Sequence, residues 1–229
     1  MASTIVFDFD GTVVVGNGPV LAYARQMARY ADDAFLTEAI ATIEAFESGA
    51  TDRFRDGYDV VGTLAAEAGI GSDDRQRAYL ASREQLGSAE PATAAPGLKE
   101  ILESLPESTR VVLATNAPLA GVENALEGWG VREHFDELLY DTGKPNGLTP
   151  IIERELAHGR VLSVGDIVEN DLAPAAELGA DTALVGATAA TSTFSATMRA
   201  LTLAEIADQI VAWAHAAEHD TTAHLISER

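Results

Sequence analysis

Beyond Gly97 the sequence alternates between short apolar runs and segments with helical spacing, and this alternation constrains the fold more than any other feature. The apolar runs occupy residues 110–115, 135–140, 160–165 and 181–185, and the helical segments occupy 98–105, 119–129, 150–158 and 171–178. Strands that alternate with helices form parallel sheets, because each helix carries the chain back to the start of the next strand. Together with a β-branched and aromatic run at 4–9, the pattern predicts an α/β fold with a doubly wound parallel sheet. A closing helix is predicted after Thr202, which forms a capping-box pattern with Glu205.

A long helical stretch interrupts this pattern after the first predicted strand. Residues 16–19 form a Gly/Asn/Pro turn cluster, and about 70 residues with helical spacing follow, ending in a linker-like segment at 88–96. A segment bracketed by two joints in this way is typical of an inserted domain. We therefore predict a core domain formed by residues 1–16 and 92–229, with an inserted helical cap at residues 17–91.

The charge of the chain excludes several classes of partner. Its 36 acidic and 15 basic residues give a net charge of −21, which repels the phosphates of nucleic acids and anionic membrane surfaces. The sequence has no cysteine, so a thiolate metal site or thiol nucleophile is excluded. With no long apolar run and no secretory signal pattern at residue 1, we expect a cytoplasmic protein that binds neither nucleic acid nor membrane.

The same acidity supports two interpretations. Lys99 and Lys144 are the two lysines among the 15 basic residues, and the excess of arginine, aspartate, glutamate and alanine favours a protein that works in molar salt. An ordinary acidic surface encoded by a GC-rich genome is the alternative.

Acidic residues follow two of the predicted strands, at the edge where parallel sheets bind ligands. Asp8 and Asp10 are two positions apart, so their side chains project to the same side of an extended segment, and Gly11 permits a sharp exit. Asp166 follows a later strand. Carboxylates brought together there need a counter-charge, and an all-oxygen cluster suits Mg²⁺. Lys144 supplies a second, fixed positive charge.

The motifs at these strand ends resemble those of the haloacid dehalogenase superfamily. They are Asp8-Phe9-Asp10-Gly11-Thr12, Thr115-Asn116, Lys144-Pro145 and Gly165-Asp166 followed by Asp171. Their order and the position of the insert resemble the phosphatases of this superfamily that carry a helical cap after the first motif, such as phosphoglycolate phosphatases. Ile167 departs from the pattern, since a small polar residue commonly follows the Gly-Asp pair.

The resemblance implies a role for each of these residues. Asp8 would be the nucleophile that forms an aspartyl-phosphate, and Asp10 would be the general acid and base. Mg²⁺ would be bound by the carboxylates of Asp8 and Asp166 and by the backbone carbonyl of Asp10. The resemblance also implies that Thr115 and Lys144 bind the phosphoryl oxygens, that Gly11, Thr12 and Asn116 assist in binding the substrate, and that Asp171 lies beside the metal or Lys144.

These roles predict a magnesium-dependent phosphomonoester hydrolase acting on a small cytoplasmic metabolite such as a phosphoglycolate, a sugar phosphate or a nucleotide. A phosphomutase of the same fold is the alternative, because it differs in passing the phosphoryl group to a second sugar hydroxyl. A phospho-accepting signalling protein is an alternative from another class. Signalling proteins of that class have a different motif order and no inserted cap, and both differences oppose that interpretation.

Overall fold

The computed structural model describes residues 3–86 and 92–227, which form two compact units. The described residues of the first, here called the sheet unit, are 3–14, 94–117 and 127–227. Those of the second, the helical unit, are 15–86, 92–93 and 118–126. Within the described residues, no helix is long and apolar enough to cross a membrane.

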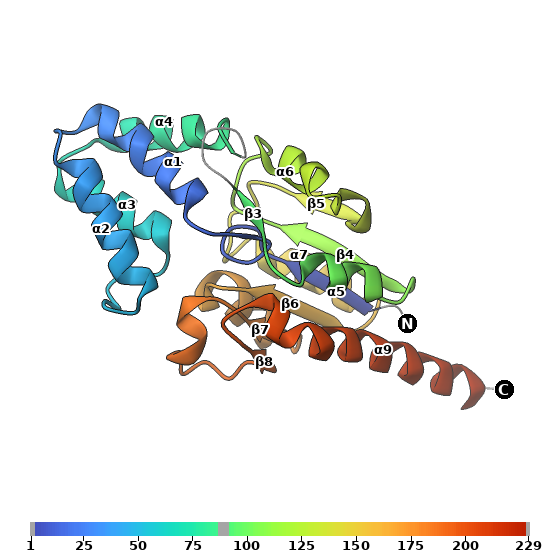
Figure 1. The fold of residues 1–229 in the computed structure, drawn as a ribbon. Coiled ribbons are helices and arrows are strands. Elements are labelled where there is room, and N and C mark those ends of the chain that lie inside the picture. The colour runs from blue at the N-terminus through green and yellow to red at the C-terminus, as the bar shows by residue number, and fades with distance from the viewer. Residues whose placement is uncertain (1–2, 87–91, 228–229) are drawn as a thin grey trace. The chain divides into compact units, whose positions relative to one another are not determined.

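The sheet unit is built on six parallel strands (Figure 1). In chain order they are β1 Ser3–Phe7, β4 Thr109–Ala114, β5 Glu137–Leu139, β6 Val161–Gly165, β7 Asp181–Leu184 and β8 Met198–Arg199. In space their order is β5-β4-β1-β6-β7-β8, and every neighbouring pair is parallel. The predicted α/β fold with a doubly wound parallel sheet is confirmed.

Strand β1 lies at the centre of this sheet, where the order of the strands reverses direction. Ile5 pairs with Val111 of β4 on one side and with Leu162 of β6 on the other. All five residues of β1 are buried, and four of them, Thr4 to Phe7, are β-branched or aromatic, as expected of a central parallel strand covered on both faces. The residues that follow β1, β4 and β6 therefore emerge beside one another at the carboxyl edge, where open α/β sheets bind ligands.

Helices cover both faces of the sheet. Helices α5 (Leu98–Ser104) and α9 (Leu203–Ser227) pack against each other on one face, and α7 (Leu148–Leu156) and α8 (Ala173–Glu177) pack against each other on the opposite face. The face covered by α7 and α8 has a continuous apolar core that includes Val6, Val112, Leu148, Ile152 and Ala175. Short helical turns complete this unit: η2 Arg132–His134, η3 Val168–Leu172 and η4 Ala187–Ala190.

The helical unit has a core of its own. Its helices are α1 Gly18–Met27, η1 Ala28–Tyr30, α2 Phe35–Glu47, α3 Gly57–Glu67 and α4 Ser72–Arg83. Buried apolar residues from all four α-helices, including Met27, Ile43 and Val61, form one cluster, and the rings of Tyr23, Tyr58 and Tyr79 contact one another beside it. Helix α6 (Val122–Gly128) begins in the helical unit and ends in the sheet unit.

Several elements differ from their predicted form. The linker predicted at 88–96 contains the short strand β3 (Thr93–Ala94), which pairs with β2 (Val14–Val15); residues 87–91 lie outside the described residues. Strand β8 lies within a small-residue loop, where two residues are too few to produce a pattern. At the start of α9, Glu205 accepts a hydrogen bond from the amide of Leu201, one residue before the amide that a capping box would use.

Candidate active site

The predicted site residues converge at the carboxyl edge of the sheet unit. Asp8 follows β1, Thr115 follows β4 and Asp166 follows β6, and Lys144 lies in the loop between β5 and α7. The backbone hydrogen bonds of the sheet continue as far as Asp8 and Thr115. The Asp8 amide donates to Val164 O and the Thr115 amide donates to Leu139 O, each at 2.9 Å. The backbone at the site is thus an extension of the sheet.

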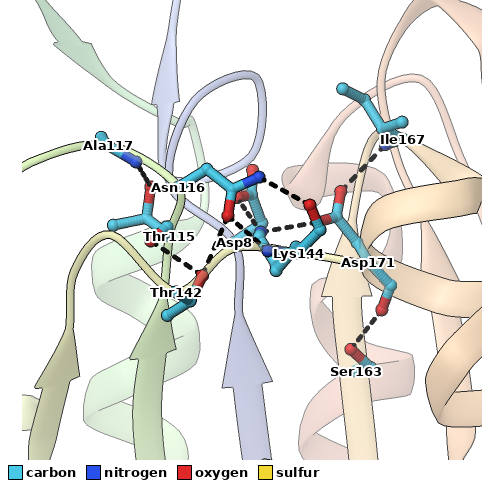
Figure 2. A network of polar contacts seen from close by, with 9 residues as sticks. All are labelled: Asp8, Thr115, Asn116, Ala117, Thr142, Lys144, Ser163, Ile167 and Asp171. Carbon is cyan, nitrogen blue, oxygen red and sulfur yellow. Dashed lines mark hydrogen bonds and ion pairs between the residues drawn. The ribbon is translucent and has the colours of Figure 1, made fainter. Parts of the chain in front are cut away.

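Lys144 lies between two carboxylates (Figure 2). Its Nζ is 2.5 Å from Asp8 Oδ1 and 2.6 Å from Asp171 Oδ1. The three side chains are almost fully withdrawn from solvent, with 3% of Lys144, 10% of Asp8 and 4% of Asp171 exposed. Because a buried charge without a partner is costly, both carboxylates depend on the Lys144 ammonium, and the ammonium depends on them.

This burial shifts the protonation equilibria of the site. Burial raises the pKa of Asp8 from its ordinary value to about 7, although the Lys144 ammonium opposes the rise. Burial alone would lower the pKa of Lys144, but the carboxylates of Asp8 and Asp171 raise it above its ordinary value. Lys144 is therefore a permanent cation at neutral pH, whereas Asp8 is close to its midpoint in the protein without a bound ion.

Asp171 is held from three sides. Its Oδ2 accepts a hydrogen bond from the Ile167 amide at 3.0 Å, and its backbone carbonyl accepts one from Ser163 Oγ at 2.7 Å. Since the bond from residue 167 comes from the backbone, the apolar Ile167 side chain does not disturb it. A Cβ on Gly165 would lie 2.3 Å from the Cβ of Asp171, so glycine at this position allows the close approach.

Three carboxylates could hold a metal ion. Oxygen atoms of Asp8, Asp166 and Asp171 all lie within 4.8 Å of one another. A cluster of carboxylate oxygens is the donor set that suits Mg²⁺, and Lys144 neutralises only part of its negative charge. The residues present therefore fit the predicted cation. The carboxylate of Asp10 is outside this group; the resemblance assigns the metal to its backbone carbonyl, and that assignment stays a prediction.

The loop after β1 brings Gly11 and Thr12 to the same edge. Gly11 has φ +86°, and a Cβ there would lie 2.2 Å from Asp166 Oδ2, so glycine gives Asp166 its space. Thr12 is 1% exposed, and its hydroxyl oxygen has no hydrogen-bond partner within the described part of the chain.

The segment after β4 contacts the loop that carries Lys144. The Thr115 hydroxyl oxygen accepts a hydrogen bond from the Ala117 amide at 2.9 Å. Asn116 Oδ1 accepts from the Lys144 amide at 2.7 Å and lies 3.1 Å from Thr142 Oγ1, while its Nδ2 donates to the Lys144 carbonyl at 3.1 Å. Sequence reasoning missed Thr142 and Ser163, because neither stands within a recognised motif.

Comparison with known proteins gives a family match and many structural matches. The family model described as haloacid dehalogenase-like hydrolase matches residues 2–179. No curated protein matches the chain.

The structural matches extend over nearly the whole chain. The HAD-hydrolase YfnB from Bacillus subtilis, described as bound to magnesium, has a TM-score of 0.61 at 18% identity, with 91% of this chain and 98% of that chain covered. CbbY from Rhodobacter sphaeroides, described as in complex with phosphate, has a TM-score of 0.60 at 18% identity, with 90% and 96% covered. A subfamily IA hydrolase from Geobacter sulfurreducens has a TM-score of 0.58 at 19% identity, with 91% and 100% covered. At these identities the likeness concerns the fold.

Proposed function

The chain belongs to the haloacid dehalogenase-like hydrolase family, and we propose that it hydrolyses phosphomonoesters of small cytoplasmic metabolites with Mg²⁺ as its cofactor. The observation that carries the proposal is the placement of the Lys144 ammonium between the carboxylates of Asp8 and Asp171, beside Asp166. Fixed positive charge stabilises a transferring phosphoryl group, and a carboxylate can serve as the nucleophile that accepts it. The phosphate and magnesium named for two structural matches agree with this choice.

Asp8 and Asp10 would perform the bond-making steps. An oxygen of the ionised Asp8 carboxylate attacks phosphorus, the bond from phosphorus to the ester oxygen breaks, and Asp10 gives its proton to the departing oxygen. Asp10 then removes a proton from water as the water attacks the phosphorus of the aspartyl-phosphate. Inorganic phosphate leaves and Asp8 regains its carboxylate, so one difficult displacement becomes two easier ones.

The remaining residues would stabilise charge on the transferring group. Lys144 faces Asp8 and, through its ammonium, would bind a phosphoryl oxygen. The Thr115 hydroxyl accepts from the Ala117 amide, so its proton can be donated to another phosphoryl oxygen. Asp171 holds the ammonium from the side away from Asp8, which keeps Lys144 in place when Asp8 is esterified. The Gly11 and Thr12 amides are proposed to assist.

Magnesium would be held by the carboxylates of Asp8 and Asp166 and by the Asp10 carbonyl, and when bound it would neutralise charge on the phosphoryl oxygens. Both oxygens of Asp171 already accept hydrogen bonds, from Lys144 and from the Ile167 amide. Its proposed role is therefore to orient Lys144, although it lies within reach of the same ion.

We propose residues 17–91 as the cap that selects the substrate, with 1–16 and 92–229 as the catalytic core. The buried cluster within the helical unit supports this division, because a segment that packs against itself can move as one body.

An aryl phosphate assay tests the proposal. The purified protein should release phosphate from p-nitrophenyl phosphate with Mg²⁺ and not with EDTA, and Asp8→Asn should abolish the release. Asp208→Asn removes an exposed carboxylate from α9 and serves as the matched control, with activity unchanged. Undiminished turnover in Asp8→Asn would contradict the mechanism. Product analysis with a hexose 1-phosphate would separate the hydrolase from a phosphomutase, since only the latter returns an isomeric sugar phosphate.

A further inference from the structure

The position of the Lys144 ammonium depends on a loop outside any helix or strand. Lys144 lies between β5 and α7, and a lysine side chain is a flexible four-carbon stem. Its Nζ must nevertheless remain between Asp8 and Asp171, at 2.5 and 2.6 Å. A long side chain can place its charge reproducibly only if the backbone that carries it is itself held.

Asn116 holds that backbone at both of its polar groups. Its Oδ1 accepts from the Lys144 amide at 2.7 Å, and its Nδ2 donates to the Lys144 carbonyl at 3.1 Å (Figure 2). One side chain thus provides the pair of hydrogen bonds that a neighbouring strand would provide to a residue in a sheet. Because Asn116 directly follows β4 and Thr115, the loop is tied to the end of the sheet.

Thr142 extends this contact to the start of the loop. Its hydroxyl lies 2.9 Å from the Thr115 carbonyl and 3.1 Å from Asn116 Oδ1, so its single proton can be donated to either. The Thr142 amide also donates to the Thr115 carbonyl, at 3.1 Å. The side-chain oxygen of Asn116, Oδ1, therefore faces two donors, both from the loop that contains Lys144.

We infer that Asn116 and Thr142 are positioning residues, which act on the reaction by fixing the backbone of Lys144 and thereby the ammonium between Asp8 and Asp171. This role differs from the direct substrate contact that the family resemblance implies for Asn116. It rests on the proposed function only in assigning the Lys144 ammonium to the phosphoryl group.

The scarcity of lysine in the chain allows a test that needs no turnover. Lys99 is 53% exposed on α5, whereas Lys144 is 3% exposed, so acylation by acetic anhydride followed by peptide mass spectrometry compares the two in one sample. In Asn116→Ala the labelling of Lys144 relative to Lys99 should rise about tenfold, the order expected when a few hydrogen bonds stop holding a loop closed. Thr142→Val should give a smaller rise, and Thr142→Ser, which keeps the hydroxyl, should behave as wild type.

Trp213→Phe is the matched control for destabilisation, since it removes one hydrogen bond from the sheet unit, between Trp213 Nε1 and Asp181, and should leave the ratio unchanged. An unchanged ratio in Asn116→Ala, or an equal rise in Trp213→Phe, would overturn the inference.

Kinetics on the aryl phosphate separate positioning from substrate contact. Asn116→Ala should lower kcat by about 10- to 100-fold, the cost of a small misplacement of a charged group, with little change in KM. A raised KM with kcat retained would assign Asn116 to the substrate and overturn the inference. If the wild-type protein does not hydrolyse the aryl phosphate, the proposed function fails, while the labelling ratio still decides whether Asn116 and Thr142 hold Lys144.

Discussion

Replacing Asp8 by Asn should change how the stability of the protein depends on pH. The ordinary pKa of this carboxyl is 3.8, whereas burial raises its pKa to about 7 in the folded protein. Between these values the folded state binds the proton more tightly than the unfolded chain. The stabilisation is complete below pH 3.8 and is lost as pH rises toward the folded pKa of about 7. At about 1.4 kcal/mol for each pKa unit, the loss is of the order of 4 kcal/mol.

Urea unfolding in EDTA at pH values from about 4.5 to about 8 measures this effect. Carboxyl groups remote from Asp8 contribute equally to both proteins, so the difference in unfolding free energy between wild type and Asp8→Asn reports on the site that contains Asp8. Wild type should lose stability relative to the variant as pH rises, with the difference levelling off above the folded pKa, where the carboxylate is fully ionised. Lys144 stays protonated throughout and does not contribute to the slope.

The exposed-site variant Asp208→Asn should follow the wild-type curve. Parallel curves for wild type and Asp8→Asn would refute the reasoning, because they would mean that the buried carboxyl titrates at its ordinary value. If wild type instead gained unfolding free energy relative to Asp8→Asn as pH rises, the reasoning would also be refuted. The ion pair with Lys144 would then outweigh the cost of burying the Asp8 carboxylate.

Three further predictions concern the site's glycine, a hydrogen bond and the acidic surface. Gly11→Ala should lower activity about tenfold or more, because the alanine Cβ would lie 2.2 Å from Asp166 Oδ2. Gly11 and Gly179 both have a positive φ, so alanine at either position should cost about 1–2 kcal/mol of unfolding free energy in urea. Gly179 has open space around it, so Gly179→Ala should keep its activity. Trp213→Phe should lose about 1–2 kcal/mol by the same measurement, because the 2.8 Å hydrogen bond to Asp181 disappears; an unchanged midpoint would show that water replaces it. At a net charge of −21, the unfolding midpoint should rise between low and molar KCl, and a midpoint that stays constant would remove the hypothesis of salt adaptation.

The strands of the sheet could be predicted from sequence because their burial leaves a local signal. Residues 5–7 are apolar on both faces, as a central parallel strand must be, and the residues after them had to emerge at the carboxyl edge. Strand β8 gave no such signal, because a two-residue edge strand is defined by its neighbour β7 and not by its own composition.

Side-chain contacts across the fold could not be predicted in this way. Glu155 falls in the helix expected at 150–158, where an acidic residue is normally exposed, yet it is 2% exposed and accepts a hydrogen bond from Thr4 Oγ1 at 3.1 Å. The bonds from Asn116 to the backbone of Lys144 join residues 28 apart in sequence. Neither contact has a periodicity, so each becomes visible only in three dimensions.

The pairing of β2 with β3 has a consequence for how such a protein can be altered. The chain leaves the sheet unit at Val14–Val15 and returns to it at Thr93–Ala94, and these two short strands are hydrogen-bonded neighbours. Paired strands lie about 5 Å apart, a distance that a tight turn of a few residues can bridge. A version with a short hairpin in place of the helices between β2 and β3 should therefore keep the order of the strands in the sheet, although residues 118–126, which belong to the helical unit, would lose their packing partners. The six-stranded sheet and the helices between β2 and β3 can in this sense be altered separately.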